Sequence, residues 1–340
     1  MKRLLFLFVI AGLVSASCTR NVYVPVQKPA AVYVGQHINK VAIVNRSIPE
    51  SKDAAMVTGV LTGSLPALNK EASQRAIEGL YRSLQDNYRY EVVRTSEEYT
   101  TPSLWGDWPS HMQWAEVERL CKKYNVDALI LLEAFDSNFL VTNGARDVKK
   151  KDSSGKEFLA KEFYVEGVAT VKLGFRMYDP VKKEITDEYM FNHVNRWERT
   201  GTALQLIIGS IIENRQAVNE TAYASGSVYA TRISPVWIRV TREFYTKGRG
   251  NSDFKIGVRR ATVNDWKGAM EAWHKSVNSH KRKTAGRSAF NLALMYEIMG
   301  DLETARKWAQ KAYVDYGIKK GRDYSNILQR RIRDAQLLDQ

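Results

Sequence analysis

The chain has 340 residues, 44% of them hydrophobic and 26% charged, which is the composition of a globular protein long enough for two domains. Its 51 Lys and Arg residues outnumber its 37 Asp and Glu residues, so the net charge is +14. Only two cysteines occur, which excludes a small fold held together by several disulfides.

The first residues have the three parts of an export signal. Lys2 and Arg3 precede a short apolar run from Leu4 to Val14, and three small residues come directly before Cys18. The apolar run is too short to span a bilayer stably, so we predict a signal peptide over residues 1–17.

Small residues before a cysteine resemble the lipobox of bacterial lipoproteins, in which the cysteine thiol is acylated and becomes the first residue after cleavage. Ser15 stands where that family usually has leucine. The resemblance implies a lipoprotein of the Bacteroidota kind with fatty-acyl chains such as palmitate on Cys18, held in the cell envelope at the outer membrane. No acidic run follows Cys18, because Thr19, Arg20 and Asn21 come next, and this favours a position facing the periplasm. An ordinary signal peptide with Cys18 as a bystander is the alternative. Lipidation would leave Cys121 without a partner cysteine, so no internal disulfide is expected.

Residues 18–36 are predicted to be a lipidated tether. They contain Pro25 and Pro29 and several Val and Tyr residues, and we assign them no clear hydrophobic period. Such a segment suits a link between the membrane and the first folded domain.

A mixed α/β domain is predicted for residues 37–245, and its first half alternates strands with helices. The expected elements are a strand at 40–44, a helix around 77–84, a strand at 90–93, a helix around 114–124 and a strand at 128–132. The last of these strands is the most apolar, which predicts a central place in a sheet. Cys121 shares a helical stripe with Trp114 and Val117, so we expect it to be a buried apolar side chain rather than a nucleophile.

The second half of this domain changes to antiparallel strands after an excursion rich in Lys and Gly at 144–156. Alternating residues predict strands at 170–177 and 185–197, joined as a long hairpin at Asp179-Pro180. The segment 203–244 is predicted to be helical, with Pro235 opening a new helix or marking a kink. Its apolar start, Ala203–Ile212, is expected to be a buried helix or strand.

This order of elements, a mixed sheet with flanking helices behind a lipobox, resembles the periplasmic domain of curli-secretion (CsgG-like) lipoproteins and the amino-terminal domain of TolB-type proteins. The resemblance implies fold rather than function. In the CsgG-like family the hairpins assemble into a membrane pore, so an oligomeric secretion or assembly component is an alternative function, with a homo-oligomer as its state.

The segment 246–340 is predicted to be an all-α helical domain that resembles the tetratricopeptide repeat. The residues that carry the resemblance are Leu292, Ala293, Tyr296, Gly300, Asp301, Leu302, Ala305, Trp308 and Ala312. An upstream copy, Asp265, Trp266 and Ala269, stands 36 residues before its counterpart, close to the family period of about 34. These one and a half repeats are too few for a free-standing solenoid.

Repeats of this kind bind through the inner face of their first helix. The resemblance places a protein-binding groove at Arg287, Phe290, Asn291, Leu294 and Glu297. The alternative is that the chain's own terminal helix, around 325–338, fills this groove.

No catalytic or metal-binding spacing is present in the sequence. Phosphate-loop, GxSxG, HExxH and paired CxxC patterns are absent, and the five histidines are scattered. We therefore expect no catalytic residue, no metal and no cofactor. An enzyme with an unrecognised site stays open only if Glu133 and Asp136, at the end of the central strand, converge in a pocket.

The segment 246–340 holds 20 Lys and Arg against 10 Asp and Glu. This excess fits anionic headgroups, nucleic acid, an acidic protein or simple solvation, and export argues against nucleic acid. We therefore predict a membrane-anchored envelope lipoprotein that acts as a non-enzymatic scaffold and binds an envelope protein through its helical groove.

Overall fold

The computed structural model describes residues 18–50, 66–101, 103 and 106–338; the expected signal peptide lies outside these ranges. The chain divides into two compact units. The first, Ala30–Val236, is called the sheet unit below. The second joins Met1–Pro29 to Trp237–Gln340 and is called the helical unit. A mixed α/β region followed by an all-α region is therefore confirmed.

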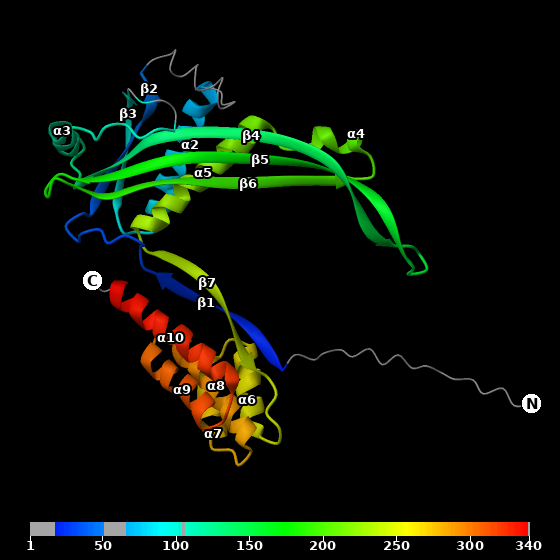
Figure 1. The fold of residues 1–340 in the computed structure, drawn as a ribbon. Coiled ribbons are helices and arrows are strands. Elements are labelled where there is room, and N and C mark those ends of the chain that lie inside the picture. The colour runs from blue at the N-terminus through cyan, green and yellow to red at the C-terminus, as the bar shows by residue number, and fades with distance from the viewer. Residues whose placement is uncertain (1–17, 51–65, 102, 104–105, 339–340) are drawn as a thin grey trace, which may run out of the picture. The chain divides into compact units, whose positions relative to one another are not determined.

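The sheet unit is built on one five-stranded mixed sheet (Figure 1). Its strands, in spatial order, are β3 (Glu91–Thr101), β2 (Lys40–Pro49), β4 (Ala128–Lys151), β5 (Glu157–Asp179) and β6 (Glu184–Gly201). β2 runs parallel to β3 and β4, whereas β4, β5 and β6 are antiparallel. The first five residues of β4, Ala128–Leu132, are fully buried, as predicted for a central strand covered on both faces.

Helices cover both faces of the sheet. α2 (Pro66–Gln85) and α5 (Asn214–Ile233) share a core with one face, and α3 (Trp114–Tyr124) packs on the other. α2 and α5 cross with their backbones in close contact, because a Cβ at Gly79 would lie only 1.9 Å from the carbonyl oxygen of Tyr223. Glycine is therefore required at this crossing.

Cys121 lies on α3 and is buried beside Val117 and Leu120. Burial raises the pKa of its thiol to about 12, so the group stays protonated at neutral pH. This agrees with the expectation of an apolar side chain rather than a nucleophile.

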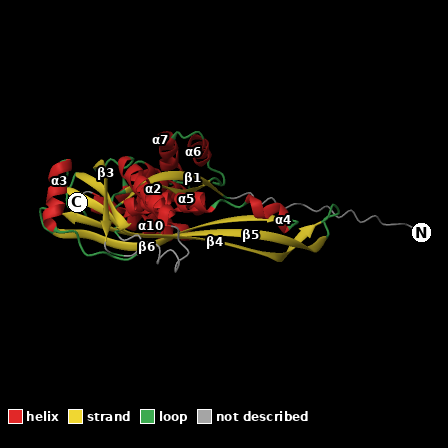
Figure 2. Cartoon of the chain, turned by 90° about the horizontal axis from the view of Figure 1, so that it is seen from above, coloured by secondary structure: helices red, strands yellow, loops and turns green. Residues whose placement is uncertain are grey.

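The Lys- and Gly-rich excursion expected at 144–156 is instead mostly strand. β4 and β5 stay paired out to Lys151 and Glu157, and only a tight turn at 152–156 remains. The sequence of these exposed strands does not alternate apolar and polar residues. Charged cross-strand pairs stabilise them instead, such as Arg146 with Glu162, whose side chains are 3.0 Å apart. Figure 2 shows this hairpin extending beyond α2 and α5.

The segment 203–212 is partly helical, which is one of the two expected forms, but the expectation that it is buried is wrong. It forms the short helices α4 (Leu204–Ile207) and η1 (Ile208–Ser210), in which Leu206 is 76% exposed and Ile208 49% exposed. Only one side of this segment lies against the extended strands, where Ile207 packs at Gly201.

The helical unit contains a two-stranded ribbon that the sequence analysis missed. β1 (Thr19–Lys28) pairs with β7 (Val236–Tyr245), so residues 19–28 are not an irregular tether and Pro235 opens a strand rather than a helix. Apolar residues alternate along β1, and Val22, Val24 and Val26 pack into the core of the helical unit. The backbone N–H of Thr246 donates to the carbonyl oxygen of Cys18 at 2.9 Å, which fixes Cys18 at one end of the ribbon.

Five helices complete the helical unit. They are α6 (Ser252–Thr262), α7 (Trp266–Ser276), α8 (Arg282–Ile298), α9 (Leu302–Val314) and α10 (Lys319–Leu338). The offset of 36 residues reappears in the structure, because Asp265 and Asp301 both cap the helix that follows them and Ala269 and Ala305 are both fully buried. Among the described helices none is both long enough and apolar enough to cross a bilayer.

Candidate functional site

The five residues predicted to form a binding groove all lie on α8, but the chain itself covers that face. Phe290, Asn291, Leu294 and Glu297 are buried, and only Arg287 keeps part of its surface. The structure therefore differs from an open groove. It agrees in part with the alternative of self-filling, because β7 as well as the terminal helix α10 occupies the face.

β7 is held on α8 by side chains that pair with its backbone. The amide of Asn291 accepts a hydrogen bond from Tyr245 N at 2.7 Å and donates one to Tyr245 O at 2.9 Å, as a neighbouring strand would. Arg287 donates to the carbonyl oxygen of Lys247, and its guanidinium lies 5.0 Å from the centre of the Tyr245 ring.

α10 and β7 meet at the carboxylate of Glu297. Its side chain is completely buried and accepts hydrogen bonds from Arg242 of β7 at 2.9 Å, from Arg331 of α10 at 2.6 Å and from the Tyr324 hydroxyl. Burial by itself would raise the pKa of Glu297, but these hydrogen bonds and the charge of Arg242 outweigh it and hold the pKa below its ordinary value.

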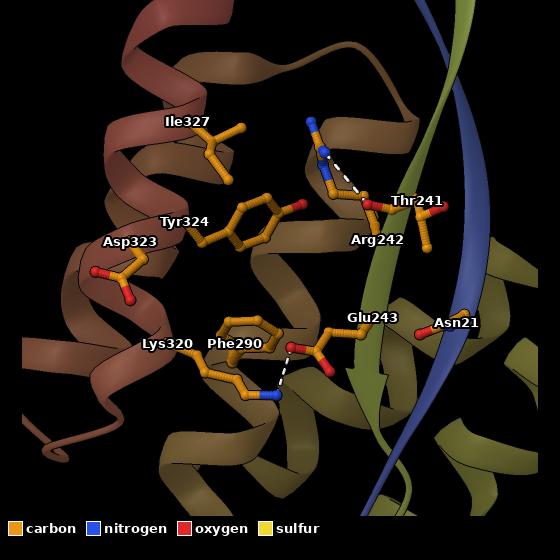
Figure 3. Close-up of a pocket in the computed structure, with 9 residues that line it drawn as sticks. All are labelled: Asn21, Thr241, Arg242, Glu243, Phe290, Lys320, Asp323, Tyr324 and Ile327. Carbon is orange, nitrogen blue, oxygen red and sulfur yellow. Dashed lines mark hydrogen bonds and ion pairs between the residues drawn. The ribbon is translucent and has the colours of Figure 1, made fainter. Parts of the chain in front are cut away.

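One end of this face stays open as a pocket of about 410 Å³ between α10 and the ribbon (Figure 3). It is lined by Asn21, Thr241, Arg242, Glu243, Phe290, Lys320, Asp323, Tyr324 and Ile327. Phe290 and Tyr324, with ring centres 5.3 Å apart, form apolar walls. The ion pair between Lys320 and Glu243, at 2.5 Å, bridges α10 and β7 at its rim.

This pocket suits recognition better than chemistry. Its walls are aromatic and aliphatic, and its charged groups are already paired, so an apolar side chain flanked by polar groups would fit. The tyrosine hydroxyl is not a base at neutral pH, because burial and the neighbouring Glu297 keep the pKa of Tyr324 well above its ordinary value. Of the five predicted groove residues, Phe290 alone lines the pocket.

The two carboxylates considered for an enzyme have different hydrogen-bond partners. Glu133 is buried and accepts hydrogen bonds from Arg46 at 2.7 Å, from Arg176 and from the Tyr178 hydroxyl at 3.0 Å. Asp136 instead accepts from Asn69 at 3.0 Å. Within the described ranges, no group of three His, Cys, Asp or Glu side chains is placed to hold a metal ion.

Two family models match the chain. Residues 38–245, more than half of the sequence, match the family described as Domain of unknown function (DUF8603). The chain belongs to this family. The DUF8603 match runs from just before β2 to the end of β7. A second model, Domain of unknown function (DUF6340), matches residues 255–330, which lie within α6 to α10.

Two solved structures overlap with the chain at low sequence identity. The PelC dodecamer from Paraburkholderia phytofirmans has 12% identity and a TM-score of 0.24, covering 63% of this chain and 98% of its own. A neuraminyllactose-binding hemagglutinin homolog from Helicobacter pylori has 12% identity and a TM-score of 0.27, covering 60% and 90%. These scores support no argument about fold or function. No curated protein matches the sequence.

The pairing of Glu297 predicts a pH-dependent stability. Because its pKa is lowered on folding, the unfolded chain binds more protons, so the stabilisation is complete above the unfolded pKa and is lost as pH falls through the folded pKa. Glu297→Gln should lower the free energy of unfolding by about 3 kcal/mol at pH 7 and flatten its decline toward acid. Denaturant unfolding followed by circular dichroism at several pH values measures both.

The matched control is Glu271→Gln on the exposed surface of α7. It should leave both the stability and its pH dependence nearly unchanged. If Glu297→Gln were equally silent, the buried carboxylate would not hold the ribbon and α10 on α8.

Proposed function

We propose that the protein is a non-enzymatic scaffold of the bacterial cell envelope, anchored by lipid on Cys18 and binding another envelope protein through its helical unit. The tripartite start of the sequence supports export, and the small residues before Cys18 support lipidation. The absence of an acidic run after Cys18 favours an outer-membrane position facing the periplasm. Cys18 is exposed at the start of β1, which suits an attachment point. The Bacteroidota-type lipoprotein and tetratricopeptide resemblances support the same proposal.

The observation that carries the binding role is the pocket beside Phe290. Because β7 and α10 occupy the rest of the predicted groove, a partner would contact the helical unit here and not along the whole of α8. Its volume and apolar walls fit one large apolar side chain of a partner, and the polar rim fits the adjoining backbone and polar side chains.

Site-specific crosslinking in intact cells tests this role. A photoreactive amino acid at Asp323, which lines the pocket, should give a discrete adduct with an envelope protein that mass spectrometry identifies. The same group at Arg330, exposed farther along α10, should not. Adding Ile327→Glu should remove the Asp323 adduct, because a carboxylate placed against Phe290 and Tyr324 disfavours an apolar side chain.

Equal labelling from both positions, or no adduct from Asp323, would contradict binding at this pocket. The Ile327→Glu protein must keep the helical content of the parent, measured by circular dichroism, for the loss of the adduct to be read as loss of binding.

A second candidate, an oligomeric assembly component, is favoured by the extended strands of the sheet unit. Past Leu132, β5 is the only described strand that pairs with β4, and β6 ends the sheet. Neither edge has a neighbouring strand among the described residues, so both could pair with another copy. Cross-strand register places Leu140, Val168 and Val194 on one face, and Leu140 is 59% exposed.

The size of the protein in mild detergent tests this second candidate. Light scattering should give a mass of several copies, and Leu140→Lys with Val194→Lys should lower it by placing charge on the contacting face. The matched control, Lys149→Gln with Lys150→Gln near the hairpin turn, should leave the mass unchanged. A parent that stays monomeric at high concentration would rule out the assembly.

A further inference from the structure

The position of Cys18 fixes how closely a lipid anchor would hold the helical unit to a membrane. Its carbonyl oxygen accepts the hydrogen bond from Thr246 N, and the strand begins at the next residue. An acyl group on this cysteine would therefore attach the bilayer directly to the folded unit, with no flexible spacer between them.

Basic residues from three segments gather beside this end of the ribbon. After Thr246 the chain enters a loop whose Arg249 carbonyl accepts a hydrogen bond from Thr284 at 3.4 Å, at the start of α8. The Lys281 ammonium lies 2.3 Å from the position that a Cβ on Gly250 would take, so the two segments touch. We call the exposed residues gathered here the basic face: Arg20, Lys247, Arg249, Lys281, Arg282 and Lys283.

Few acidic residues stand near the segments that form the basic face. The sequence has no Asp or Glu from 246 to 252 or from 278 to 287. Within the described part of the chain, Arg249, Lys281 and Lys283 form no ion pair, and Arg282 donates to the backbone oxygen of Asp315 at 2.9 Å.

The start of α8 adds to this positive potential. Lys281 is its N-cap residue, without a side-chain hydrogen bond, and Arg282 and Lys283 form its first turn. Cations at a helix N-terminus oppose the helix dipole and destabilise the isolated protein, whereas an anionic surface placed against them would relieve that repulsion. The arrangement therefore fits an anionic partner.

We propose that the basic face rests on the anionic phospholipid headgroups of the membrane that holds Cys18. The inference rests on the proposed lipid anchor, which would hold these side chains against the bilayer surface. Headgroup attraction acts within a Debye length of about 8 Å, and such a direct attachment would keep the basic face inside that range. Anchor and basic face together would orient the helical unit on the membrane.

Vesicle binding by the mature chain, residues 18–340 carrying Cys18→Ser, tests the basic face without a lipid. The chain should bind phosphatidylcholine vesicles only when they contain phosphatidylglycerol. The variant Arg249→Gln, Lys281→Gln, Lys283→Gln should bind them roughly tenfold more weakly or worse. The control variant Lys307→Gln, Arg330→Gln, Arg333→Gln removes the same charge from exposed positions on α9 and α10 and should lose less than about threefold.

Equal losses in the two triple variants would overturn the inference, because net charge rather than the basic face would then drive binding. Binding by the parent that does not depend on phosphatidylglycerol would overturn it as well, because headgroup charge would then not drive binding. Circular dichroism melting curves should match between the variants, so that a loss of binding is not a loss of fold.

Membrane fractionation of cells tests the lipid anchor separately from the basic face. Cys18→Ala should leave the membrane fraction after a high-salt wash, which weakens headgroup attraction but does not extract a lipidated protein. If Cys18→Ala stays in the membrane after that wash, the lipid anchor fails and the reason for this orientation fails with it. If the anchor holds but the vesicle test fails, only the basic face is refuted.

Discussion

The buried carboxylate of Glu297 is the constraint on which the helical unit depends. One side chain on α8 receives hydrogen bonds from Arg242 on β7 and from Tyr324 and Arg331 on α10, so two segments distant in sequence are fixed to the same face. A buried charge is stable only when paired in this way, and the loss of the Glu297 carboxylate would leave Arg242 and Arg331 without their shared acidic partner.

This packing determines what the helices can bind. With β7 and α10 in place, most of the inner face of α8 is core, and the pocket at Phe290 remains open beside the Lys320–Glu243 ion pair. The same packing also positions β1, because β1 pairs with β7. The hydrogen bond from Thr246 N to Cys18 O lies just before the first residue of β1. The pocket and Cys18 therefore belong to the same compact unit, the helical unit.

The sequence predicted the elements whose apolar period is long and regular. The central strand at Ala128–Leu132, the helices of the sheet unit and the helix pair around Gly300 all follow from spacing alone. β1 and β7 were missed although Val22, Val24 and Val26 alternate strictly, because prolines nearby favoured irregular structure. Pairing between strands more than 200 residues apart has no local signal.

The sequence predicted which residues share one face of α8, but not that other parts of the chain cover this face. Repeat spacing placed Arg287, Phe290, Asn291, Leu294 and Glu297 on one face of a helix, and they do share that face. Spacing does not show what covers a face. That the amide of Asn291 pairs with the backbone of Tyr245 follows only from the tertiary packing of a strand that the sequence analysis expected to be helical.

Amide hydrogen exchange tests most directly whether the ribbon packs on α8 in solution. The account predicts slow exchange at the amides of Tyr245 and Thr246, which donate to Asn291 and to Cys18, and fast exchange at the hairpin turn, residues 152–156. If Tyr245 and Thr246 exchanged as fast as that turn, the ribbon would not be fixed on α8, and the groove would be open.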